Sequence, residues 1–147
     1  TSFGRIQGVL GGRLEHLEIV GGQPQRFTLL LETIRTQGVP QRINVEAVEN
    51  IARIGGGQSP FVGLAGNVAS FFKEFVYAKI GVRAVLENDQ FRINGTITED
   101  GVEYLVRKGG LPGVDIVNLN PTNQISFKDM IKRVQRVSES ESGPVVR

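Results

Sequence analysis

The chain has 147 residues, of which 39% are apolar and 22% charged, a balance typical of one globular domain and not of a disordered chain. Its formal net charge of +2 is too small to indicate general nucleic-acid binding, so nucleic acid is not expected as a partner. The absence of cysteine excludes disulfides, thiolate metal sites and cysteine nucleophiles.

Residues 3–35 are predicted to form antiparallel strands that are joined by glycine turns. Gly11-Gly12 and Gly21-Gly22 are the predicted turns, and apolar residues alternate with polar ones in the strands. The alternation slips after Leu14, which predicts a β-bulge near His16. The strand that follows carries apolar side chains on both faces, so we expect it to be partly covered on both sides.

Two helices are predicted between the sheet segments. The apolar residues of 45–54 recur at a helical period, and the glycines at 55–57 end that helix. Ser59-Pro60 is typical of a helix start and predicts a second helix over 61–77, whose apolar stripe contains several phenylalanines. Such a stripe usually packs in a core, and its functional alternative is the lining of an acyl-chain groove. The apolar stretch 60–72 is shorter than the roughly 20 residues that a membrane span needs.

The clearest pattern lies in residues 82–119, where apolar and polar residues alternate in short strands. Asn88-Asp89 and Asp100-Gly101 are tight turns, which make these strands antiparallel. A register slip of one residue would expose the whole apolar set, so the register is well specified.

A final amphipathic helix is expected over 126–137. Ser126 and Asp129 resemble a capping box at its start. Docking on the sheet is the ordinary fate of such a helix, and lying on an anionic membrane surface is the alternative. Residues 138–147 are expected to be a flexible tail.

Together these patterns predict an α+β fold with a single domain over residues 1–137. We expect a mainly antiparallel, curved sheet with helices covering one face and an amphipathic helix at its C-terminal end.

No residue pattern predicts catalysis. His16 is the single histidine, whereas a metal site needs three or four ligands, and no Gly-x-Ser-x-Gly elbow exists. The glycines at 55–57 lack the Lys-Ser/Thr of a phosphate-binding loop. We therefore expect no catalytic residue, no metal and no cofactor. A deep polar pocket with a strongly shifted carboxylate would revive the enzyme alternative.

Several segments resemble the C-terminal region of large AsmA-like proteins of Gram-negative bacteria, including the TamB and YhdP types. The segments that carry the resemblance are Phe75-x-Tyr77-x-x-Ile80-Gly81-Val82, Leu86-x-Asn88-x-x-Phe91, Glu103-Tyr104-Leu105-Val106, Asn118-x-Asn120-Pro121 and the earlier Gly22-Gln23-Pro24-x-x-Phe27. The resemblance covers most of residues 3–137.

The resemblance implies a long periplasmic protein, anchored to the inner membrane by an N-terminal segment outside this sequence, with a hydrophobic groove in a curled sheet. Such proteins are associated with phospholipid movement between membranes and with outer-membrane integrity. This chain would be a non-enzymatic C-terminal module, partnered by phospholipid or a membrane surface and by upstream β repeats of the same protein. The alternative is a structural or protein-interaction module that accepts a strand at its sheet edge without binding lipid.

The candidate contacts with lipid or a partner are apolar side chains of the second and final predicted helices: Phe71, Phe72, Phe75, Phe127, Met130, Ile131 and Val134. The candidate contacts with lipid phosphates are the basic side chains Lys128, Lys132 and Arg133. An acyl chain gains about 0.8 kcal/mol for each methylene that it buries, so an apolar sheet face could hold lipid. The chain's own helices could equally fill that face.

Overall fold

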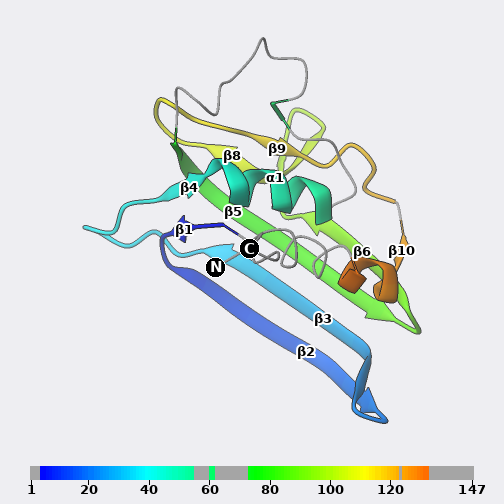
Figure 1. Cartoon of the computed structure of the whole chain (residues 1–147). Coiled ribbons are helices and arrows are strands. Elements are labelled where there is room, and N and C mark those ends of the chain that lie inside the picture. Colours follow the sequence, from blue (N-terminus) through cyan, green and yellow to red (C-terminus); the bar gives the residue numbers. More distant parts are fainter. Residues whose placement is uncertain (1–3, 55–59, 62–72, 123, 133–147) are drawn as a thin grey trace, which may run out of the picture.

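The computed structural model describes residues 4–54, 60–61, 73–122 and 124–132. These residues form a mainly antiparallel sheet, with helix α1 after its fourth strand and a short helix at residues 127–132 (Figure 1). The elements are β1 (Ile6–Gln7), β2 (Leu10–Val20), β3 (Gln23–Thr33), β4 (Arg42–Asn44), α1 (Val45–Ile54), β5 (Glu74–Glu87), β6 (Gln90–Gly95), β7 (Ile97–Glu99), β8 (Val102–Lys108), β9 (Ile116–Val117) and β10 (Ile125–Ser126). The antiparallel sheet is as predicted, but it is not strongly curled.

Strand β5 is the centre of the sheet, because both of its edges are paired along most of its length. One edge pairs with β4 and then with β3, and the opposite edge pairs with β8 and then with β6. The register shifts between Tyr77 and Lys79, as in a β-bulge. This shift places Tyr77 on the same face as Ile80, although an even alternation would put them on opposite faces, and both side chains are buried in one core cluster.

Side chains close the gap that the loop between β3 and β4 leaves on β5. The Thr33 hydroxyl accepts a hydrogen bond from the Ile80 N–H at 2.8 Å and donates to the Ile80 carbonyl at 3.3 Å. The Gln41 amide donates to the carbonyls of Tyr77 and Ala78 at 3.0 and 2.9 Å. These contacts satisfy backbone groups that would otherwise lack a ladder partner.

Strands β2 and β3 form a long hairpin at the edge of the sheet. The predicted bulge near His16 is confirmed, since this residue has a φ of 57° and the register shifts between Glu15 and Glu18. The predicted turn at Gly21-Gly22 is also confirmed. The predicted turn at Gly11-Gly12 is wrong, because both glycines lie inside β2 and pair with β3.

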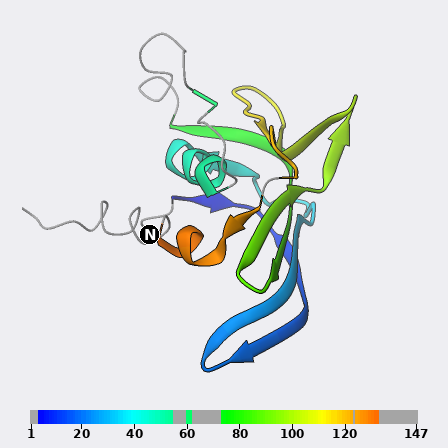
Figure 2. The ribbon, with the colours of Figure 1, turned by 90° about the vertical axis from the view of Figure 1, so that its right-hand side faces the viewer.

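Helix α1 begins where the sequence places it, at the end of β4. The Asn44 side chain caps it by accepting a hydrogen bond from the Ala47 N–H at 2.9 Å. The helix buries Ala47, Val48 and Ala52 against the β4–β5–β8 part of the sheet. A second cluster at the other end of β5 contains Ala84, Leu86, Phe91 and Met130. In Figure 2, α1 and the short helix lie on the same side of the sheet.

The second predicted helix is wrong at its C-terminal end. Phe75 and Tyr77 lie in β5, which begins at Glu74, and residues 62–72 lie outside the described residues. Phe75 and Tyr77 are both buried while Val76 is only partly buried, so a period of two governs this segment. The phenylalanine stripe that predicted the helix extends the apparent helical period into the strand.

The strand segment between the predicted turns at Asn88-Asp89 and Asp100-Gly101 is divided at Thr96. Strand β6 pairs with β5, whereas β7 leaves that edge and pairs with β8. Gly95 permits this departure, because a Cβ at this position would collide with the Tyr104 carbonyl.

The final helix is confirmed over residues 127–132, and 133–137 lie outside the described residues. The Ser126 hydroxyl accepts a hydrogen bond from the Asp129 N–H at 3.3 Å, as a cap does. Asp89, in the turn after β5, accepts from the Lys128 N–H at 3.2 Å and from the Ser126 hydroxyl at 2.9 Å. The start of this helix is therefore tied to the end of the central strand.

Candidate functional site

Three of the predicted lipid contacts lie in the chain's own core. Phe75 and Met130 are buried in the two core clusters. Phe127 is half-buried, and its ring centroid lies 5.9 Å from that of Phe27 in an edge-to-face contact. These side chains fill the sheet face over β5 and β6.

The other predicted contacts divide into two groups. Ile131, Lys128 and Lys132 are exposed on the short helix. The candidates that lie outside the described residues are Phe71, Phe72, Arg133 and Val134.

Among the described residues, exposed leucines of the sheet lie on the β2–β3 hairpin. We call this surface the hairpin strip and define it as the exposed Leu10 and Leu14 of β2 with the partly buried Leu29 and Leu31 of β3, of which Leu29 also packs against the second core cluster. Leu14 pairs with Leu29, which in turn pairs with the buried Ala84, so the strip shares the face that carries the core clusters. Leu10 is 40% and Leu14 52% exposed. In the described part of the chain, this apolar face is therefore filled over β5 and exposed at Leu10 and Leu14 of β2.

The strip stays open because of where the two helices sit. Helix α1 contacts β4 and β9, and the short helix packs on Phe27, in the first half of β3. Gly12 lies between Leu10 and Leu14 and pairs with Leu31, so no side chain of its own covers that position. The result is an apolar surface on which Leu10 and Leu14 are exposed.

Sequence reasoning did not select this hairpin. The signal was a loss of alternation near the end of β2, where Leu17, Ile19 and Val20 are all about half exposed. A loss of alternation is typical of a bulge as well as of an exposed ribbon, and the bulge at His16 accounts for only part of it.

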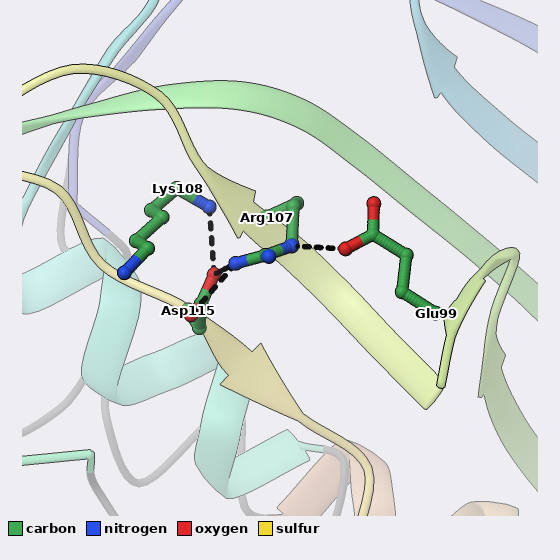
Figure 3. Close-up of polar contacts among 4 residues, drawn as sticks. All are labelled: Glu99, Arg107, Lys108 and Asp115. Carbon is green, nitrogen blue, oxygen red and sulfur yellow. Dashed lines mark hydrogen bonds and ion pairs between the residues drawn. The ribbon is translucent and has the colours of Figure 1, made fainter. Parts of the chain in front are cut away.

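Arg107 forms the densest ion-pair cluster in the described residues (Figure 3). Its Nε donates to Glu99 at 2.6 Å, and its Nη1 donates to both carboxylate oxygens of Asp115 at 2.9 and 3.0 Å. The guanidinium also lies 4.8 Å from the centre of the Tyr104 ring. The hydrogen bonds to Glu99 and Asp115 raise the pKa of Arg107 further above its ordinary value. Glu99 lies in β7 and Asp115 directly precedes β9, so these contacts of Arg107 hold both segments to β8.

Two other carboxylates are also engaged in holding the sheet. One oxygen of Glu103 accepts hydrogen bonds from the Gly95 N–H at 2.9 Å and from the Asn118 amide at 2.7 Å. Glu32 accepts from the Thr96 hydroxyl at 3.0 Å and lies 3.3 Å from the Lys79 ammonium. These two contacts, the hydroxyl first, lower the pKa of Glu32. Both carboxylates brace the point where β6 leaves β5.

Chemistry-bearing groups do not converge in the part of the chain that the structure describes. His16 sits on the β2 bulge, and residues 4–54, 60–61, 73–122 and 124–132 contain no group of three histidines or carboxylates that could hold a metal ion. A shallow hollow of about 350 Å³ on the outer face of the hairpin is lined by Gly11, Arg13, Leu30 and Ile34 among others. None of the described helices is long and apolar enough to cross a membrane.

Comparison with known proteins assigns neither a family nor a function to this chain. The chain matches no family model, no curated protein and no solved structure. The AsmA-like resemblance therefore remains a prediction.

Proposed function

We propose that this chain is a non-enzymatic C-terminal module of an AsmA-like periplasmic envelope protein, and that its hairpin strip contacts lipid acyl chains. The observation that carries the proposal is the contrast on one sheet face, where side chains of the chain itself fill the part over β5 and leave Leu10 and Leu14 half exposed. We also propose that the helices cover this sheet face over β5 and that they leave the hairpin strip uncovered.

The chemistry of the strip suits an acyl chain. A methylene gains about 0.8 kcal/mol on burial, so a row of leucines can hold a hydrocarbon chain without any polar contact. The strip offers no donor or charge that would select a headgroup. We therefore expect it to accept phospholipids according to their chains, as a module for moving lipid between membranes would. An inner-membrane anchor in an N-terminal segment belongs to the same proposal.

Native mass spectrometry of the purified chain with added phospholipid tests this proposal. Leu14→Thr removes the most exposed leucine of the strip and keeps a residue that favours strands. Leu119→Thr is the matched control, because Leu119 is also largely exposed and lies outside the hairpin.

We expect lipid adducts on the wild type and on Leu119→Thr, and few on Leu14→Thr. No adducts on any of the three proteins, or equal adducts on all three, would overturn the proposal.

A second candidate function is extension of the sheet by a strand from a partner, such as an upstream β repeat of the same protein. Within the described residues β2 pairs only with β3, so its other edge is open to a further strand. The bulge at His16 interrupts this edge, which leaves Leu10–Glu15 as the regular part. Slower hydrogen exchange of amides in residues 10–15 in a longer chain, compared with this one, would support strand addition, and equal exchange would exclude it there.

A further inference from the structure

We infer that the tip of the β2–β3 hairpin inserts into the interface of a lipid bilayer. We call residues 19–24 the hairpin tip. The inference rests on the proposed function, in which the chain contacts lipid. It concerns the hairpin tip, which is a different surface from the hairpin strip.

The hairpin tip extends beyond the three-stranded part of the sheet. The last pair between β3 and β5 is Arg26 with Glu87, whereas β2 and β3 go on pairing to Val20 and Gln23. Figure 2 shows this hairpin reaching past the end of β5 and away from both helices. In the described residues the tip is thus a two-stranded ribbon that no helix or third strand covers.

Both faces of the hairpin tip carry large aliphatic side chains. Ile19 pairs with Pro24 and Val20 pairs with Gln23, so these neighbouring side chains point to opposite faces of the ribbon. Their exposed fractions are 54% and 58%. Leu17, in the bulge just before them, is also half exposed.

The charges around the tip leave its apolar part neutral. No charged residue occurs from Ile19 to Gln25. Glu18 and Arg26, the charged residues nearest to the tip, face each other in the strand register at its base, and the Arg26 guanidinium lies 3.7 Å from the Glu87 carboxylate of β5. An apolar, uncharged end above these charged residues fits a surface whose interior is hydrocarbon and whose rim is polar.

The two-faced arrangement selects the bilayer over a protein surface as the occupant. A protein that docks on a sheet covers one face, and would leave either Ile19 or Val20 in water. A bilayer interface surrounds an inserted tip and desolvates both side chains together. Because the tip lacks net charge, we expect insertion into neutral and anionic bilayers alike, with little effect of salt. Adsorption through Lys128 and Lys132 would instead require anionic lipid.

A tryptophan scan can test the insertion, because the chain contains no tryptophan. Val20→Trp places the single indole at the tip, and Leu111→Trp places it at an almost fully exposed site in the loop after β8. The probes are vesicles of phosphatidylcholine and vesicles of phosphatidylethanolamine with phosphatidylglycerol. Few aliphatic side chains give weak partitioning, so lipid is used at concentrations on the order of millimolar.

We expect Val20→Trp, and not Leu111→Trp, to shift its emission to the blue with both kinds of vesicle and to be quenched by lipids with brominated chains. In vesicle sedimentation, Ile19→Thr with Val20→Thr should lower the partition coefficient about tenfold. Leu111→Thr with Leu119→Thr should leave it unchanged, and circular dichroism checks that each variant is folded.

Three results would overturn the inference. One is the absence of a shift at Val20→Trp with either vesicle, and another is an equal shift at both sites. The third is a shift that appears with rising protein concentration and without lipid, which would make a second copy of the chain the occupant.

The inference and the proposed function can fail separately. Loss of vesicle insertion while Leu14 variants still lose bound lipid would remove the inference alone. If the tip inserts into vesicles while lipid adducts do not depend on Leu14, only the proposed role of the hairpin strip would be overturned.

Discussion

Two regions of this sheet differ in what covers them. One is the region around the central strand β5, and the other is the β2–β3 hairpin at the edge. At one end β4, β8 and α1 surround β5 and bury Tyr77, Val48 and Leu105. At the edge of the sheet, the β2–β3 hairpin carries Leu10 and Leu14, which are 40% and 52% exposed. The comparison shows that apolar side chains alone do not make a core, because a helix or another strand also has to pack on them.

The largest expected effect separates the two regions by one chemical change. Leu105 is 2% exposed, so Leu105→Ala should lower the free energy of unfolding by about 2–5 kcal/mol. Leu14→Ala, at the hairpin strip, should cost less than about 1 kcal/mol, because it leaves no cavity. Urea unfolding followed by circular dichroism measures both. Equal costs would mean that the hairpin strip is covered in solution, and the comparison would fail.

An intermediate effect is expected at the contact between the packed end and the edge strand β1. The Tyr77 hydroxyl donates a hydrogen bond to the Gln7 carbonyl at 2.6 Å, and Tyr77→Phe leaves that carbonyl without this donor. We expect a cost of about 1–2 kcal/mol in the free energy of unfolding. Tyr104→Phe is the matched control and should cost less than about 0.5 kcal/mol. A Tyr77→Phe protein as stable as wild type would show that this contact does not hold β1.

The same tyrosine predicts a pH dependence at high pH. Burial raises the pKa of Tyr77 above its ordinary 10.0, so the unfolded chain ionises first. The stability from this group is present below pH 10.0 and is lost as the pH rises further. Wild type should therefore lose more stability above this pH than Tyr77→Phe does.

The smallest effect is expected where the hairpin meets the central strands. The Thr96 hydroxyl and then Lys79 lower the pKa of Glu32 from 4.5, so its contribution is present above pH 4.5 and is lost as the pH falls below it. Solvent screens this partly exposed carboxylate, so the change should stay below about 1 kcal/mol. Thr96→Val should flatten the acid limb of stability against pH, and Thr98→Val, on the neighbouring strand, should not. An unchanged acid limb in Thr96→Val would show that the hydroxyl does not stabilise the carboxylate.

Sequence patterns predicted the parts of the fold in which a local period decides the structure. The helix at 45–54, the bulge at His16 and the turn at Asn88-Asp89 all follow from spacing and turn residues. The pattern failed at Phe75, where the helical stripe of phenylalanines extends into an alternating strand. It also failed at Gly11-Gly12, because a glycine pair fits a strand as well as a turn when it pairs with a neighbour.

The candidate site was the least predictable part, for a physical reason. Phe75 and Met130 were predicted to contact a ligand, and they pack in the core, while Leu14, which was not among the predicted contacts, is 52% exposed. An apolar residue has the same pattern whether the chain's own helix or a foreign molecule covers it. Long-range contacts decide which part of the sheet a helix covers. One example is the hydrogen bond from the Lys128 N–H to Asp89 at the start of the short helix.

Away from the shift after Tyr77 and the misassigned segment at Phe75, the sequence by itself therefore determined which residues share a face, because the side-chain period of a strand or helix is a local property of the backbone. The tertiary structure alone decided which parts of that face are filled. Burial depends on contacts between segments far apart in the chain, such as the hydrogen bond between Thr33 and Ile80. The pattern of a single segment does not predict such contacts.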